Sequence, residues 1–292
     1  MTERSFQIRI KKKKDESGAD QMPDETYIII FPEYEQLREE IKKLKTELSM
    51  LVLEFDELQF IICPNVKTAY QLAFGALELR VFDAYCLYLR LRRMVDMIRA
   101  RQNRREKVDL KAIEAALDQE FDEYMAQREE QLRMLNEAIE RSKADFLSDE
   151  ETAELKKLYR KAVKALHPDL HPDQTPEEAS LFLKAVSAFQ NGDLRLMRVV
   201  CEAIGGDAPQ FSQTDSLEEL RTERDRLKQS LSEIKAEMEA LKKKPPYTLR
   251  PYVDDAEKAD ALKQSLQEKL SGYESANERL QQMIWEMTEN ES

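Results

Sequence analysis

The chain has 292 residues, of which 36% are charged and 6 are glycine, and its formal net charge is −12. At roughly 150 residues per domain, this length predicts about two domains. Few glycines and many charges favour long helices, and they exclude collagen, a disulfide scaffold and a glycine-loop nucleotide fold. The acidic balance argues against a general nucleic-acid binder, which is normally basic.

Cysteine usage and hydropathy indicate a protein of the cytoplasm. Cys63, Cys86 and Cys201 lie far apart, so they form neither a disulfide framework nor a paired zinc motif. The first residues contain a lysine run but no apolar signal core. No stretch approaches the ~18 consecutive apolar residues of a membrane-spanning helix. We therefore expect a cytoplasmic location and no contact with a membrane.

Residues 1–31 contain the one strand-like pattern in the chain. Phe6 to Ile10 alternates apolar and polar residues, and Tyr27 to Phe31 is a short apolar run. A short β-hairpin and an unstructured tail both fit this segment, because an isolated hairpin is only marginally stable in water.

Residues 32–146 predict three long helices that form an antiparallel bundle or a hairpin stalk. The first has a heptad seam from Leu37 to Ile62, and we expect it to break at Cys63-Pro64-Asn65 because proline cannot continue a helix. The second is expected over residues 66–102 and the third over residues 110–143. The short connections indicate antiparallel neighbours.

Residues 207–292 return to a heptad pattern. One seam runs from Leu217 to Leu241 with Arg224 as its polar member, and another runs from Leu262 to Met287. Pro245 and Pro246 separate them. This pattern predicts an antiparallel coiled-coil hairpin, and pairing between two copies of the chain, which would give a homo-oligomer, is the competing outcome.

Residues 147–206 lack a simple heptad pattern. Ser148 and Glu151 form a capping box that starts a helix. Four cations of this helix are spaced by three or four residues and so share one face: Lys157, Arg160, Lys161 and Lys164. The helix is expected to end at the loop that contains His167-Pro168-Asp169 and His171-Pro172-Asp173. Thr175 and Pro176 then start a second helix.

This segment resembles the J domain of the DnaJ family of co-chaperones, and we call it the J-like segment. Tyr159, Arg160 and Lys161 precede His167-Pro168-Asp169 at the spacing of the family, and Phe182 and Phe189 resemble its next helix. The resemblance implies a helical hairpin with four core side chains: Tyr159, Leu166, Phe182 and Phe189. It also implies docking on a DnaK-type heat-shock chaperone and stimulation of ATP hydrolysis in that partner, for a client that the sequence does not name. The docking residues would be His167, Pro168, Asp169, Lys157, Arg160, Lys161 and Lys164.

The register of the resemblance distinguishes the two triplets. His167-Pro168-Asp169 matches the family position, whereas His171-Pro172-Asp173 falls where the family usually carries other residues. The first helix of the family is not visible before residue 148. The end of the preceding helix, with Leu132, Leu135 and Ile139, is the candidate to replace it as a packing partner. A glycine-phenylalanine linker and a cysteine-rich zinc module are absent from the sequence.

Other functions have weaker support. A metal site at His167, Asp169, His171 and Asp173 has suitable ligand types, but the intervening prolines oppose their convergence, so we expect no metal or cofactor. No catalytic triad or phosphate loop is present, and we expect no enzymatic activity.

Two further interpretations remain open. Residues 90–107 hold eight cations against Asp96 and Glu106, which would suit an acidic partner or nucleic acid. A solvated helix end is the favoured interpretation, and we do not expect a nucleic-acid partner. The alternative to a co-chaperone is a coiled-coil scaffold whose J-like segment no longer docks.

Overall fold

The computed structural model describes residues 32–143, 147–204 and 216–289, and its regular structure within these ranges is entirely helical. The expectation of an all-α protein is therefore confirmed for this part of the chain. Residues 1–31, with the hairpin or tail, lie outside the described residues. No helix within the described ranges is long and apolar enough to cross a membrane.

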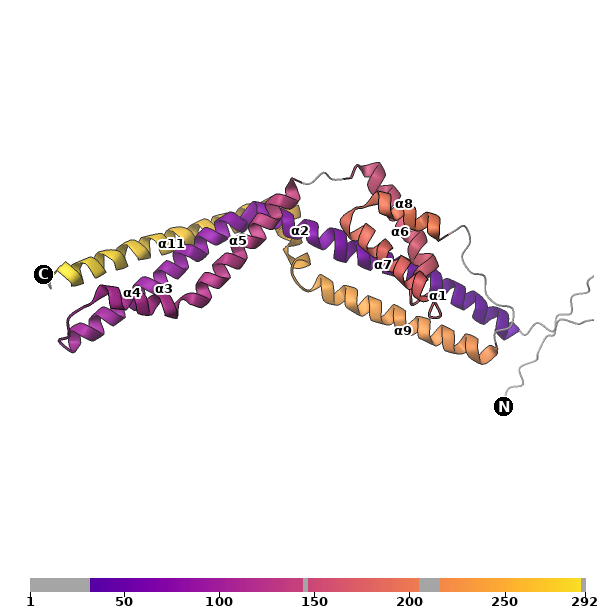
Figure 1. Ribbon diagram of the computed structural model, residues 1–292, viewed down its shortest axis with the longest axis horizontal. Helices are drawn as coiled ribbons and strands as arrows, with labels where there is room; N and C mark the ends of the chain where they lie inside the picture. The colour runs from indigo at the N-terminus through magenta and orange to yellow at the C-terminus, as the bar shows by residue number, and fades with distance from the viewer. Residues whose placement is uncertain (1–31, 144–146, 205–215, 290–292) are drawn as a thin grey trace, which may run out of the picture. The chain divides into compact units, whose positions relative to one another are not determined.

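In chain order the helices are as follows, where η1 and η2 are π-helical and η3 is a 3-10 helix: α1 (Pro32–Glu57), η1 (Leu58–Ile62), α2 (Cys63–Tyr70), η2 (Gln71–Gly75), α3 (Ala76–Asn103), α4 (Leu110–Glu120), α5 (Asp122–Ser142), α6 (Asp149–Leu166), α7 (Pro176–Asn191), α8 (Leu194–Ala203), α9 (Leu217–Lys242), η3 (Tyr247–Leu249), α10 (Arg250–Asp254) and α11 (Ala256–Glu289) (Figure 1).

These helices form two compact units. Within the described ranges, unit 1 contains residues 32–58, 147–204 and 216–239, and unit 2 contains residues 59–143 and 240–289. This division differs from the expected one at residues 146 and 206, because each unit combines segments that are far apart in the sequence.

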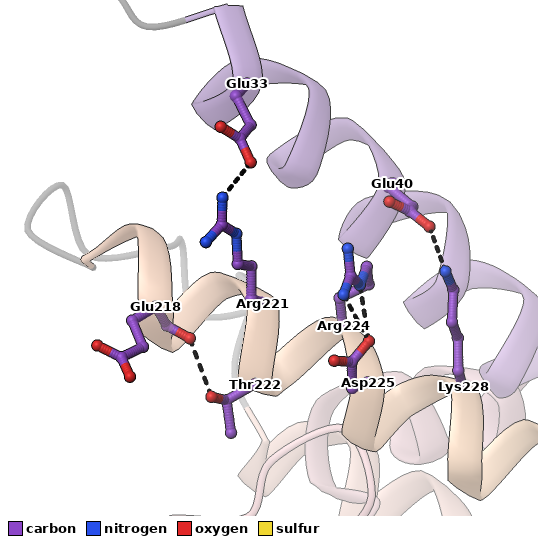
Figure 2. A network of polar contacts seen from close by, with 8 residues as sticks. All are labelled: Glu33, Glu40, Glu218, Arg221, Thr222, Arg224, Asp225 and Lys228. Atoms are coloured by element: carbon purple, nitrogen blue, oxygen red, sulfur yellow. Dashed lines mark hydrogen bonds and ion pairs between the residues drawn. The ribbon is translucent and has the colours of Figure 1, made fainter. Parts of the chain in front are cut away.

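In unit 1, α1 and α9 run parallel to one another (Figure 1). The direction follows from ion pairs that advance by seven residues on both helices at once: Glu33–Arg221, Glu40–Lys228 and Glu47–Lys235. Figure 2 shows the first two of these pairs. On the other flank, Lys45 Nζ lies 3.0 Å from Glu223 Oε1. Charged residues on both sides of a parallel helix pair are typical of a two-stranded coiled coil.

The heptad seams of α1 and α9 lie between these two charged flanks. Ile41, Leu48 and Leu227 are completely buried there. Arg224, the polar member of the α9 seam, turns its guanidinium to Asp225, as Figure 2 shows, and the Nε–Oδ1 distance is 2.8 Å. The apolar face of each helix is thus covered while its charged flanks stay at the surface.

In unit 2, α3 and α11 also run parallel. Arg80 pairs with Glu274 near the start of the contact, and Gln102 Nε2 donates to the Met287 carbonyl near its end. The α5 helix runs antiparallel to α2 and α3, as the pairs Asn65–Arg141 and Asp83–Arg128 show. Around the end of α3, a fully buried cluster holds the unit together: Ile98, Ile113 and Leu117, with Phe121 beside them.

The expected hairpin within residues 207–292 is replaced by a different pairing. Its first helix, α9, is joined to α1 by ion pairs in unit 1. Its second, α11, packs against α3 in unit 2. The physical reason is that a heptad pattern specifies an apolar seam but not the helix that covers it. In this chain, helices from the N-terminal part offer each seam a matching partner.

The expected helix break at Cys63-Pro64-Asn65 is also absent. The helical conformation continues through Ile62 into α2, and Pro64 lies in the first turn of α2. The π-helical turn of η1 directly before it changes the register of the carbonyls that proline would otherwise contact. A bend appears instead at Phe121, between α4 and α5.

Candidate docking site on the J-like segment

The first helix of the J-like segment begins as the sequence predicts. The Ser148 hydroxyl accepts from the Glu151 N–H at 3.2 Å, and the Glu151 carboxylate accepts from the Ser148 N–H at 2.9 Å. This reciprocal capping box satisfies two backbone donors that the helix leaves unpaired. The same device starts α7 at Thr175 and Glu178. The capping boxes therefore fix the residue at which each helix begins, and this determines which side chains lie on each face of the helix.

Two aromatic rings join α6 and α7. Tyr159 and Phe189 stack with their centroids 4.1 Å apart and their planes within 7° of parallel. Both rings are almost completely buried, as are Leu166 and Phe182. Tyr159 lies opposite Phe189, and His167 lies opposite Phe182, so the two helices are antiparallel. The four side chains expected in the core of the segment are thus brought together in one hairpin.

The short helix α8 closes the hairpin. Arg198 donates twice to the Glu154 carboxylate, at 2.8 and 2.7 Å, and this guanidinium holds the pKa of Glu154 below its usual value. The Cys201 thiol donates to the Leu158 carbonyl at 3.3 Å. Met197 and Val200 are also buried on α8. The geometry of α6 is therefore fixed by two helices rather than by one.

His167 ends α6 and begins the first triplet. Its backbone is extended because Pro168 disfavours the helical conformation of the residue before it. Its ring packs edge-on against Phe182, and its Nδ1 accepts from the Asp169 N–H at 3.1 Å. Burial lowers the pKa of His167, although the Asp169 carboxylate opposes this shift. A neutral ring whose Nδ1 is an acceptor carries its proton on Nε2.

His171 has a different place in the loop. Its Nε2 lies 2.8 Å from the Lys164 carbonyl oxygen in the last turn of α6, and the N–H donates to it. This contact satisfies a carbonyl that the helix end leaves unpaired. Leu170, between the two triplets, is buried. The second histidine is therefore a cap of α6, whereas the first lies on the edge of the hairpin core.

The cationic face of α6 is exposed and leads to the first triplet. Lys157, Arg160, Lys161 and Lys164 are all exposed, and Pro168 beyond them is exposed as well. Lys161 Nζ lies 3.4 Å from the Cys201 carbonyl oxygen. Among the described residues, the side chains of Arg160 and Lys164 have no carboxylate partner. The arrangement presents positive charge beside a rigid turn, which suits contact with an acidic surface.

Outside the J-like segment, α6 also packs against α1 of unit 1. The Tyr159 hydroxyl donates to Asp56 Oδ2 at 2.6 Å, and Lys156 Nζ lies 2.5 Å from Glu57 Oε1. Burial raises the pKa of the Asp56 carboxyl to about 6, against the lowering effect of the hydrogen bond from Tyr159. Burial and this carboxylate raise the pKa of Tyr159.

The expected replacement for the first helix of the family was the end of the third helix, at Leu132, Leu135 and Ile139. Leu135 packs instead within unit 2, 3.1 Å from the position that a Cβ on Gly75 would take. The contact of Asp56 was not predicted from the sequence. Its signal is present in α1, where Val52 and Leu53 are buried although they lie outside the heptad seam. Such an additional apolar stripe indicates a second packing partner.

No group of three or more histidine, cysteine, aspartate or glutamate side chains is arranged to hold a metal ion within the described ranges. Comparison with protein-family models, with curated proteins and with solved structures found no match to this chain.

Proposed function

We propose that this chain is a co-chaperone of the J-domain type, which docks on a DnaK-type chaperone and stimulates ATP hydrolysis by that partner. One observation carries the proposal. The exposed cationic face of α6 leads directly to the His167-Pro168-Asp169 turn, and a hairpin stacked through Tyr159 and Phe189 holds both in place. This supports the docking role that the sequence resemblance implies.

The two parts of the site have different tasks in this proposal. The exposed cations Lys157, Arg160, Lys161 and Lys164 increase the rate of association with an acidic surface, because long-range charges act mainly on encounter. The turn then makes the specific contact. Its hydrogen bond from the Asp169 N–H to the His167 ring fixes its shape before binding, which reduces the ordering that docking requires.

The chain itself supplies no hydrolytic group in this proposal. ATP is bound and hydrolysed by the partner, and the chain contributes a contact that changes the partner's state. A cytoplasmic location belongs to the same proposal, since a reducing compartment suits the three free thiols at Cys63, Cys86 and Cys201.

The test is the steady-state ATPase rate of a purified DnaK-type chaperone from the same source, measured with and without the full-length chain. We expect the wild-type chain to raise this rate. His167→Gln should abolish the stimulation, because the imidazole on the docking turn is lost. The matched change His171→Gln should retain most of it, because that residue caps α6 and a glutamine amide can also donate to the Lys164 carbonyl.

Circular dichroism of both variants provides the control, since each should keep the helical content of the wild type. A stimulation that survives His167→Gln but is lost in His171→Gln would overturn the assignment of the first triplet. A wild-type chain that gives no stimulation would support the scaffold alternative, in which the J-like segment does not dock.

A further inference from the structure

The turn between α3 and α4 in unit 2 carries charge that the proposed docking site does not use. Arg104, Arg105, Lys107 and Lys111 are exposed there, and we call them the cationic turn. They belong to the arginine-rich stretch near residues 90–107 or follow it directly. That stretch divides into residues with partners and residues without.

Two arginines earlier in the stretch hold carboxylates of α4. Arg90 Nη2 lies 2.6 Å from Asp118 Oδ1, and Arg93 Nε lies 3.0 Å from Glu120 Oε1. These two residues fit the expectation of a solvated helix face with acidic neighbours. The four side chains of the cationic turn have no hydrogen-bond or ion-pair partner among the described residues. Their charge is therefore available to another molecule.

The backbone conformation at Arg105 is unfavourable for any residue other than glycine. The Glu106 N–H donates to the Arg101 carbonyl, and the Arg105 N–H donates to the Gln102 carbonyl. This is the pattern of a Schellman motif, whose residue in the left-handed region is usually glycine. Arg105 occupies that position with a φ of 56°. A side chain with a Cβ is strained there, and the Arg105 side chain makes no hydrogen bond or ion pair with the described residues that would offset the strain.

Lys111 is also in an unfavourable place. It lies in the first turn of α4, where the helix dipole disfavours a cation. By contrast, Arg104 at the end of α3 is favoured by the dipole of that helix. Local stability therefore explains Arg104 but neither Arg105 nor Lys111. Two residues that each oppose local stability, close together at one exposed turn, indicate selection for binding.

We propose that the cationic turn binds a short acidic segment of a partner protein. Guanidinium groups match carboxylates in geometry, and Arg90 and Arg93 in the same stretch already hold such groups. Two exposed carboxylates, Glu106 and Asp109, lie within the turn itself. A long nucleic acid would be brought against these carboxylates, and the turn contains no aromatic ring for base stacking. A short peptide can contact the cations without lying against these carboxylates, and it needs no aromatic ring for stacking.

The experiment is fluorescence anisotropy of the full-length chain with a fluorescein-labelled octaglutamate peptide in low-salt buffer, with octaglutamine as the uncharged reference. The double change Arg104→Gln with Lys107→Gln should weaken octaglutamate binding by about tenfold or more, because two charge-assisted contacts are lost. The matched control Arg90→Gln with Arg93→Gln removes the same charge from paired residues and should change affinity by less than about twofold.

Arg105→Gly separates binding from stability. It should raise the melting temperature of unit 2 by about 2–4 °C, because glycine relieves the left-handed strain, while it weakens octaglutamate binding. Equal losses in the two double variants would overturn the proposal, since only net charge would then matter. Binding of single-stranded oligodeoxythymidine about tenfold tighter than octaglutamate, lost in the same variants, would overturn it in favour of a nucleic-acid interface.

Discussion

The α1–α9 pair carries charged residues along its flanks, whereas the α3–α11 pair carries tyrosines and a buried asparagine. In the first pair, Lys228 Nζ lies 2.7 Å from Glu40 Oε1 and Lys235 Nζ lies 2.8 Å from Glu47 Oε1. These groups remain about half exposed. Exposed ion pairs of this kind contribute little to stability, but they select the partner helix and its register.

In the second pair, the ring of Tyr273 lies 5.3 Å from Tyr85 and 5.9 Å from Tyr88, measured between centroids. Asn277 is buried, and its Nδ2 donates to the Ala84 carbonyl at 2.9 Å. Its Oδ1 has no partner among the described residues. A buried polar group with an unpaired atom reduces stability, but it penalises shifted registers even more. The register of the α1–α9 pair is thus set by ion pairs at the surface, and that of the α3–α11 pair by a polar group in the interior.

The largest effect should come from the seam of the first pair. Leu227→Ala should reduce the free energy of unfolding of unit 1 by roughly 2–5 kcal/mol, because a completely buried leucine leaves a cavity. Urea denaturation followed by circular dichroism measures this loss. Leu183→Ala, which changes a leucine of the same unit that is 68% exposed, is the matched control and should stay within about 0.5 kcal/mol. If Leu227→Ala reduced the free energy of unfolding no more than this control, charges and not the seam would hold α1 to α9.

An opposite sign is expected in the second pair. Asn277→Leu should stabilise unit 2 by about 1 kcal/mol, because it removes a buried amide whose oxygen is unpaired. Trp285, the one tryptophan of the chain, lies in α11 and reports this unfolding by its fluorescence. If the variant is instead destabilised by more than about 1 kcal/mol, the hydrogen bond to Ala84 is a net source of stability and the contrast between the two pairs disappears.

The smallest effect concerns the charged flank. Lys228→Glu should cost about 0.2–1 kcal/mol, and a second change, Glu40→Lys, should restore most of it, because the pair is re-formed in reverse. A double-mutant cycle in low-salt buffer measures the coupling, which should shrink in high salt as the charges are screened. A loss that Glu40→Lys does not restore would show that Lys228 acts through contacts other than this ion pair.

Local features of the fold could be predicted from the sequence because their chemistry is local. The capping boxes at Ser148 and Thr175 form as expected, and Gly192 ends α7 in the left-handed conformation that favours glycine. The aromatic residues Tyr159 and Phe189 were expected in the core and are buried there. Each of these depends on neighbours within a few residues or on the period of one helix.

Pairing between distant helices could not be predicted in the same way. The seams of α9 and α11 are each compatible with several partners, and proximity in the sequence favoured the wrong one. The spacing of seven shared by Glu33, Glu40 and Glu47 with Arg221, Lys228 and Lys235 was the available signal. Asp56 was missed for a related reason, since the additional apolar residues Val52 and Leu53 indicate a second packing partner for α1 but do not say which helix it is.

The parallel pairing also determines when the protein can fold during its synthesis. The residues joined by the flank ion pair of Glu47 and Lys235 are 188 positions apart, whereas Leu158 and Cys201, which join α6 to α8, are 43 apart. The ribosome adds about 5–20 residues per second. The apolar seam of α1 is therefore synthesised roughly 10–40 s before its partner helix α9. During this interval the J-like segment can already form its local contacts. Throughout that interval the nascent chain exposes the unpaired apolar face of a coiled-coil helix, which is the kind of surface that chaperones bind.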